Sequence, residues 1–151
     1  MNTKTWSMLK GDIRQRLFTL ILMLCITPMV WADKPVAPNS ISGITTVTTD
    51  QSIALILNSP ELIVIDARLI EEYQKGHIEG AVNLVDRDVT KESLANILPD
   101  KATPILIYCN GPRCLRSSRA ARKALKHGYK NIYWFRDGWA DWMKNELPIA
   151  H

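Results

Sequence analysis

The residues of this chain that are best suited to chemistry lie close together between positions 109 and 117. The stretch reads Cys109-Asn110-Gly111-Pro112-Arg113-Cys114-Leu115-Arg116-Ser117. A cysteine thiolate is a strong nucleophile, and arginine side chains bind anions through charge-assisted hydrogen bonds. The combination predicts a nucleophilic cysteine that acts on an anionic substrate.

Cys109 is the better placed cysteine of this stretch because it directly follows the apolar run Ile105-Leu106-Ile107-Tyr108. Ser117 is expected to cap the following helix, whose N-terminus carries free N–H groups and a partial positive charge. These groups, together with the two arginines, favour the thiolate over the thiol. Gly111 lets the backbone curl so that successive N–H groups point inward.

The elements that must position this loop alternate along the chain. We expect strands at 45–47, 62–65, 81–84, 105–108 and 132–135, and helices at 50–57 (capped by Asp50), 71–75, 91–98, 117–126 and 139–145. The run at 62–65 is apolar throughout, as in strands buried on both faces. The alternation predicts an α/β fold in which a mostly parallel central sheet has helices on both faces. Ligands bind at the carboxyl ends of strands in such sheets, and Cys109 lies at such an end.

The N-terminus is predicted to be a secretory signal. A basic stretch that ends at Arg16 precedes the apolar run Leu17 to Ile26, and Pro28 ends that run. Val30-Trp31-Ala32 then places small residues at the two positions that signal peptidase recognises. The apolar run is about half of the roughly 20 residues that span a bilayer, which favours a cleaved signal over the alternative, an uncleaved anchor.

This organisation gives a signal at 1–32, a linker at 33–42 and one domain at 43–151. The protein is therefore expected to be exported, with the periplasm as its compartment. Cys25 would be lost with the signal, and no cysteine follows the cleavage site, which disfavours a lipoprotein. The mature chain would keep only Cys109 and Cys114.

The charge of the chain gives no reason to expect nucleic acid or an anionic membrane surface as a partner. The formal charge is +4, but residues 1–32 contribute +3 of it, which leaves +1 for the rest. The residues responsible are Lys4, Lys10, Arg14 and Arg16, against Asp12. No cluster of histidine and cysteine has metal-ligand spacing, so neither a metal nor another cofactor is expected.

Three stretches resemble the rhodanese family, and the resemblance covers roughly residues 43–149. The first is Ile65 to Arg68 followed by Glu71 to Asn83, which is similar to the family's Asp-x-Arg, Glu-Tyr/Phe and Gly-His-Ile-x-Gly-Ala signature. The second is the Cys109 loop. The third is Asp137 to Trp142 with the ending Leu147-Pro148, similar to the family's Gly-Gly-x-x-x-Trp…Pro ending.

The resemblance implies a rhodanese-like fold and a sulfurtransferase reaction. In that reaction Cys109 attacks the outer sulfur of an anionic donor such as thiosulfate, sulfite leaves, and a thiol or cyanide takes the sulfur from the resulting persulfide. The loop residues expected to bind the donor are Asn110, Gly111, Arg113, Cys114, Arg116 and Ser117. Asp66, Arg68 and His77 are interpreted as mainly structural, with Asp66 and Arg68 supporting the site.

The loop departs from the family's pattern in length. A common form is Cys-x-x-Gly-x-Arg-Ser/Thr, and the loop is two residues longer if Arg116-Ser117 matches its end, which predicts a wider cradle. Related phosphatases have Cys, five residues and Arg, whereas position 115 of this chain is Leu115. The spacing therefore argues against a phosphatase. Asp137 also replaces the first glycine of the Gly-Gly pair.

Cys114 leaves alternatives open. In an oxidising compartment two cysteines form a disulfide by default. Cys114 is interpreted either as a small loop residue or as a resolving cysteine that attacks the Cys109 persulfide. In the second case the chain is a thiol–disulfide or sulfur-relay protein that uses both cysteines. A third reading is a catalytically silent rhodanese-like module that binds a partner protein.

Overall fold

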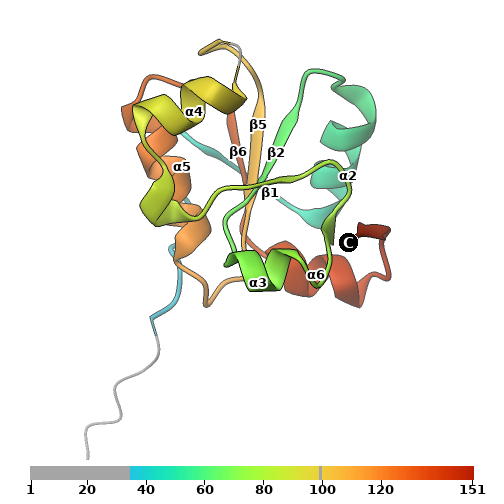
Figure 1. Cartoon of the computed structure of the whole chain (residues 1–151). Helices are drawn as coiled ribbons and strands as arrows, with labels where there is room; N and C mark the ends of the chain where they lie inside the picture. The colour runs from blue at the N-terminus through green and yellow to red at the C-terminus, as the bar shows by residue number, and fades with distance from the viewer. Residues whose placement is uncertain (1–34, 99) are drawn as a thin grey trace, which may run out of the picture. The chain divides into compact units, whose positions relative to one another are not determined.

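A five-stranded parallel sheet forms the centre of the structure, a computed structural model that describes residues 35–98 and 100–151 (Figure 1). The strands lie in the order β1-β6-β5-β2-β4, and all neighbouring pairs are parallel. The sheet strands are β1 (Thr45–Val47), β2 (Ile63–Asp66), β4 (Val82–Asn83), β5 (Ile105–Tyr108) and β6 (Ile132–Phe135). The helices are α2 (Thr49–Asn58), α3 (Ile70–Tyr73), α4 (Lys91–Ile97), α5 (Arg116–Lys126) and α6 (Gly138–Lys144), with a 3₁₀ turn at Asp86–Asp88.

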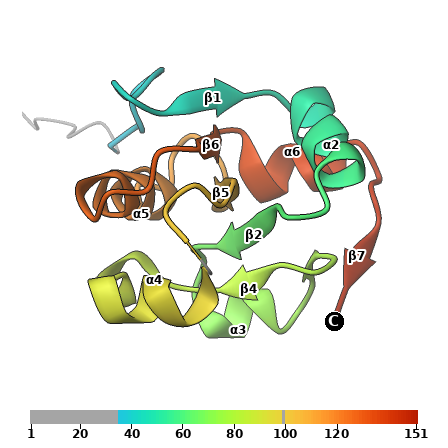
Figure 2. The same cartoon turned by 90° about the horizontal axis from the view of Figure 1, so that it is seen from above.

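Helices cover both faces of this sheet, which confirms the predicted fold class. Seen from above, α4 and α5 lie on one side of the strands and α2 and α6 on the other (Figure 2). Alternate residues of β5 point to opposite faces, so Ile105 and Ile107 pack in the core under α4 and α5, while Leu106 and Tyr108 pack in the core under α2 and α6.

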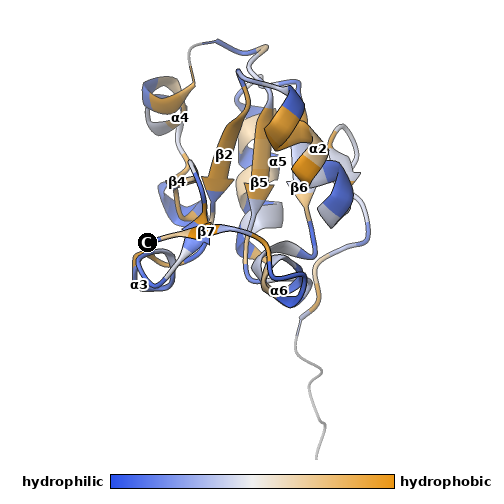
Figure 3. Ribbon diagram, turned by 90° about the vertical axis from the view of Figure 1, so that its right-hand side faces the viewer, coloured by the Kyte–Doolittle hydropathy of each residue, from blue (hydrophilic) through white to orange (hydrophobic). Residues whose placement is uncertain are grey.

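Burial on both faces explains the apolar sequence of the central strands. All four residues of β5 are buried, and apolar residues dominate β2 and β5 (Figure 3). Burying an isoleucine or leucine side chain stabilises the fold by about 1.5–3 kcal/mol. A polar side chain placed in such a strand would be buried and would need a hydrogen-bond partner there. The close packing of β5 on both faces fixes the start of the loop that follows it.

The start of α2 differs from the prediction. α2 begins at Thr49, and its cap is Thr48 rather than Asp50: the Thr48 hydroxyl accepts from the Gln51 backbone N–H, and the Gln51 side chain accepts from the Thr48 N–H. This reciprocal pair satisfies two N–H groups, whereas a cap at Asp50 would satisfy one. Asp50 lies in the first turn, where its charge is favourable.

The sequence did not predict a short antiparallel pair of strands. β3 (His77–Ile78) pairs with β7 (Ile149–Ala150) and ties the end of the chain to the segment after α3. Each strand has only two residues, which is too short to show the alternation that marks a strand. The fold is thus an α/β sheet with one small accessory pair.

The described part of the expected linker packs against the domain. Ala37 and Ile41 are buried in the core. The Ala37 N–H donates to the Pro112 carbonyl oxygen (2.7 Å), and the Arg136 guanidinium donates to the Ala37 and Pro38 carbonyl oxygens. These residues therefore support the loop that contains Pro112.

The predicted signal at residues 1–32, with Cys25, lies outside the described residues. Over residues 35–98 and 100–151, the structure contains no helix of the length and apolarity needed to cross a membrane.

Candidate functional site

The loop after β5 lies at the carboxyl end of the central strand. Cys109 is the first residue after β5, and only 1% of its surface is exposed. β2 and β6 flank β5, so the cysteine lies among the ends of three parallel strands. α5 begins at Arg116 on the far side of the loop. The predicted arrangement, in which Cys109 lies between a buried strand and a helix N-terminus, is confirmed.

Cys109 and Cys114 form a disulfide in this structure, and their Cα atoms are 6.2 Å apart. The Cys114 N–H donates to the Gly111 carbonyl oxygen (2.8 Å), which closes a turn inside the loop. Gly111 has a φ of 146°, a backbone conformation that favours glycine, so the loop curls where the sequence predicted it. Cys109 has no free thiol in this state, and reduction must precede any attack by its sulfur.

The start of α6 fixes the backbone of the loop. The Trp139 N–H donates to the Cys109 carbonyl oxygen (2.8 Å), and the Ala140 N–H donates to the Asn110 carbonyl oxygen (3.0 Å). This close approach requires glycine at position 138: Gly138 has a φ of 54°, and a Cβ atom there would overlap the Cys109 backbone. Gly138 lies in a stretch that resembles the rhodanese family, but the sequence does not show that it contacts Cys109.

Glu72 is a site residue that the sequence analysis missed. It lies on α3 and accepts hydrogen bonds from the Asn110 side chain (2.6 Å), the Arg116 guanidinium (2.8 Å) and the Leu69 N–H (3.0 Å). Burial acts to raise the pKa of the Glu72 carboxyl, but the hydrogen bonds from Asn110 and Leu69 and the Arg116 charge together hold it below its ordinary value. An ionised carboxylate therefore connects both ends of the Cys109 loop.

No periodicity or spacing in the sequence could have placed Glu72 here. It lies 38 residues before Asn110 and 44 before Arg116 in the chain, and only the fold of α3 against the loop brings the three together. The sole signal was its membership of a family stretch.

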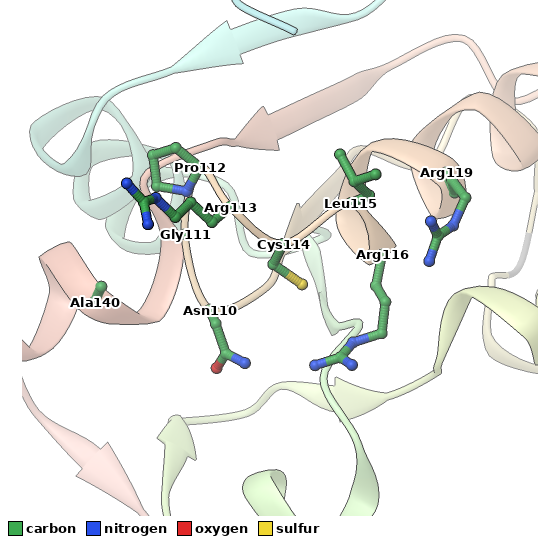
Figure 4. A pocket seen from close by; sticks show the side chains of 9 residues that line it. All are labelled: Asn110, Gly111, Pro112, Arg113, Cys114, Leu115, Arg116, Arg119 and Ala140. Carbon is green, nitrogen blue, oxygen red and sulfur yellow. The ribbon is translucent and has the colours of Figure 1, made fainter. Parts of the chain in front are cut away.

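An open pocket of about 710 Å³ lies over the loop (Figure 4). Its lining comprises Asn110, Gly111, Pro112, Arg113, Cys114, Leu115, Arg116, Arg119 and Ala140. The side chains of Asn110, Cys114 and Arg116 extend to one side of the loop, whereas that of Arg113 extends away from them (Figure 4). The pocket thus contains five of the six residues expected to bind the donor.

The charges of these arginines are not equally available. Arg116 pairs with Glu72 (2.8 Å), and Arg119, which the sequence analysis did not select, pairs with Asp86 (2.6 Å). Arg113 is exposed and forms no ion pair with any residue in the described ranges. Among the described residues, the pocket therefore has one arginine without a carboxylate partner and two that already have one.

Ser117 does not cap α5, so that prediction is wrong. α5 begins one residue earlier, at Arg116, and its cap residue Leu115 makes no side-chain hydrogen bond. The Ser117 hydroxyl is buried and accepts from the Trp134 indole N–H (3.0 Å). A polar partner in the core explains a serine at this position, and the first N–H groups of α5 are left without a side-chain cap.

Asp66 and Arg68 form a buried ion pair beneath the loop rather than part of the pocket lining. Asp66 accepts from Arg68 (2.6 Å) and from the Tyr108 hydroxyl (2.6 Å), and Arg68 also donates to the Gly76 carbonyl oxygen. Burial acts to lower the pKa of Arg68, but the Asp66 carboxylate outweighs it and raises that pKa. Burial and the Asp66 charge raise the pKa of Tyr108.

This pair fixes the residue next to Cys109. Tyr108 precedes the cysteine, and its hydroxyl both donates to Asp66 and accepts from the Ile78 N–H (3.1 Å). Arg68 also lies over the Trp139 ring, 4.2 Å from its centroid, and Trp139 donates to the Cys109 carbonyl. The network thus contacts Tyr108, which precedes the loop, and Trp139, which holds the Cys109 backbone.

His77 takes part in packing. Its ring stacks on Tyr73 with the centroids 3.8 Å apart, and Nδ1 lies 3.0 Å from the Tyr73 carbonyl oxygen. Over the described residues no three side chains of His, Cys, Asp or Glu are grouped so that they could hold a metal ion. The groups that the site offers are a cysteine sulfur, backbone N–H groups and arginines.

Comparison with known proteins places this arrangement in a family. The family model of the rhodanese-like domain matches residues 49–145. The uncharacterized protein YibN of Escherichia coli is 26% identical over 110 residues, which cover 72% of this chain and 74% of YibN. Thiosulfate sulfurtransferase PspE of Escherichia coli is 33% identical over 84 residues, which cover 54% of this chain and 78% of PspE.

A solved structure shows the same fold. The BH2092 protein of Bacillus halodurans superposes with a TM-score of 0.62 at 24% identity, over 70% of this chain and 76% of that protein. The family match at residues 49–145 spans more than half of the chain and includes the Cys109 loop, Glu72 and Gly138. The protein belongs to the rhodanese-like family.

Proposed function

We propose that the protein is a sulfurtransferase that moves a sulfane sulfur from an anionic donor, such as thiosulfate, through a Cys109 persulfide to a thiol or cyanide acceptor. The observation that carries this proposal is the position of Cys109: it directly follows the central strand, and the loop that it begins leads into the N-terminus of α5. Membership of the rhodanese-like family and the likeness to PspE support the same chemistry.

The reaction begins from the reduced protein. The Cys109 thiolate attacks the outer sulfur of thiosulfate, the sulfur–sulfur bond of the donor breaks, and its electron pair leaves with sulfite. The product is a Cys109 persulfide anion, so the total charge is unchanged. The step needs no metal and no general base, but it needs a stabilised thiolate and an environment that tolerates a second anion beside it.

Three features supply that environment. The first N–H groups of α5 have no side-chain cap, so they remain free for an anion. Arg116 points into the pocket on the same side as Cys114, and its Nε is buried without an acceptor among the described residues. A bound anion would satisfy such a donor, whose desolvation otherwise costs about 1–3 kcal/mol. Arg113 lines the same pocket and adds a positive charge that pairs with no carboxylate of the described residues.

The proposal also includes export to the periplasm, which rests on the sequence of residues 1–32. The test is the mass of the protein recovered from the periplasmic fraction of cells that express the full chain. Removal of residues 1–32 supports the proposal. A full-length chain that remains with the membranes contradicts it and supports the uncleaved anchor.

Sulfite release tests the reaction itself. Reduced protein, freed of reductant, is mixed with thiosulfate, and sulfite is measured. Wild type should release one sulfite per chain, Cys109→Ser should release none, and Cys114→Ser should still release it. Sulfite release by Cys109→Ser would remove Cys109 from the role of nucleophile, and no release by reduced wild type would favour the silent partner-binding module.

A further inference from the structure

We propose that Cys114 is the acceptor built into this chain: its thiol displaces sulfide from the Cys109 persulfide, and an external thiol then reopens the resulting disulfide by attack on Cys114. The protein would thereby reduce a sulfane sulfur to sulfide. This inference rests on the proposed function, because it requires a persulfide on Cys109.

The disulfide in the structure is the product state of this step. The loop brings the two Cα atoms to 6.2 Å, within the range of ordinary disulfides. The backbone bonds from α6 to Cys109 and Asn110, and the turn from Cys114 to Gly111, are all present in the disulfide state. The loop therefore accommodates the disulfide while the contacts that fix it remain intact.

The step balances without any added oxidant. The Cys114 thiol attacks the inner sulfur of the persulfide anion, a Cys109–Cys114 bond forms, the bond to the outer sulfur breaks, and that sulfur leaves as hydrosulfide with the proton of Cys114. The sulfane sulfur is reduced by two electrons, and the two cysteines are oxidised by two. Two equivalents of an external thiol, or one dithiol, return the cysteines to the reduced state and become a disulfide themselves.

The two sulfurs of the disulfide differ in access. Cys109 is 1% exposed and is not part of the pocket lining, whereas Cys114 is half-buried and lines the pocket. Its sulfur projects between Asn110 and Arg116 (Figure 4). An external thiolate that enters the pocket therefore meets Cys114 first.

Attack at Cys114 also gives the better leaving group. It expels Cys109 as a thiolate at the site where α5 and the arginines favour a negative charge. Thiol–disulfide exchange is faster when the leaving thiolate is stabilised, so access and leaving-group chemistry select the same sulfur. A thiol reductant thus forms its mixed disulfide with Cys114 and returns Cys109 directly to its reactive form.

The first experiment follows the outer sulfur of thiosulfate in reduced, thiol-free protein. Wild type should release one sulfite and one sulfide per chain and end as the disulfide. Cys114→Ser should release one sulfite and no sulfide, and its mass should increase by one sulfur atom. Cys114→Ala serves as a second variant, and circular dichroism confirms that both are folded.

The outcomes separate this inference from the proposed function. Wild type that releases sulfite, keeps the sulfur and yields no sulfide overturns the inference alone. Sulfur recovered on Cys114 also overturns it, because the chain is then a relay. If no protein releases sulfite, the proposed function fails and the inference fails with it.

The second experiment tests where the reductant attacks. Oxidised wild type is treated briefly with 2-mercaptoethanol, free thiols are alkylated at once, and the protein is digested. Trypsin cleaves after Arg113, so the two cysteines fall in different peptides. The mercaptoethanol adduct should lie on Cys114 and the alkyl group on Cys109; the reverse pattern overturns the proposed site of attack.

Discussion

Replacing Gly138 by alanine should damage the site far more than the same change at a glycine elsewhere. Gly138 lies where α6 begins, and its neighbour Trp139 donates to the Cys109 carbonyl oxygen. A Cβ at position 138 would come within 3.1 Å of the Cys109 carbonyl carbon and closer still to its oxygen. Both contacts are with backbone, which cannot rotate away as a flexible side chain can.

Gly80 is the matched control. It has a φ of 77°, comparable with the 54° of Gly138, but a Cβ there would meet nothing within 4 Å. Gly80→Ala should therefore show only the cost of a left-handed residue, about 1–2 kcal/mol. Gly138→Ala adds overpacking, about 1–3 kcal/mol, and a weakened hydrogen bond to Cys109, about 1 kcal/mol. The expected total is about 3–6 kcal/mol.

Gly138→Ala should also lower activity, because it displaces the backbone of Cys109. To clear the overlap, the Cys109 backbone and α6 must separate by roughly 1 Å, and a misplacement of that size can lower a rate by about 10²-fold. Urea unfolding would measure the stability of both variants, and the initial rate of sulfite release would measure activity in those still folded. If Gly138→Ala matches Gly80→Ala in both, the contact between α6 and the loop does not position Cys109.

Three further outcomes follow from the charges around the loop. Arg116→Ala should lower kcat/KM for thiosulfate about tenfold or more, because a charge-assisted hydrogen bond contributes about 1.5–3 kcal/mol; unchanged kcat/KM would leave anion binding to the backbone alone. Arg113→Ala should have a smaller effect that fades in high salt, because Arg113 is exposed and points away from Cys114 (Figure 4). Glu72→Gln should lower the free energy of unfolding by about 1 kcal/mol at neutral pH. Because the pKa of Glu72 is lowered from 4.5, that difference should shrink as the pH falls below this value, and a difference that persists at lower pH would contradict the ion pair.

The sequence predicted the elements whose causes are local. β5 and β6 lie at the expected positions because burial on both faces demands an unbroken apolar run, and such a run is visible in the sequence. The predicted position of Cys109 and its loop depends on β5, because the cysteine is the next residue after that strand. Long-range pairings leave no comparable signal: the position of Ser117 at the start of a helix predicts a cap, whereas its partner, the Trp134 indole, is distant in the chain.

The same reason explains what was missed at the site. Glu72 connects Asn110 to Arg116 only after α3 packs beside the loop, and no spacing between these residues indicates it. A glycine at position 138 indicates that another part of the chain can approach it closely. The sequence does not show which part of the backbone does so. The sequence does not predict whether the disulfide forms, because two cysteines in one loop pair only if the backbone brings their Cα atoms within about 7 Å.

The most direct experiment identifies the residue that receives the sulfur from thiosulfate. Reduced Cys114→Ser, which has no second thiol in the loop, is treated with thiosulfate labelled at its outer sulfur and digested with trypsin. One label per chain is expected, in the peptide that contains Cys109. Label in any other peptide, or a folded protein that takes up none, would show that Cys109 does not carry the sulfane sulfur.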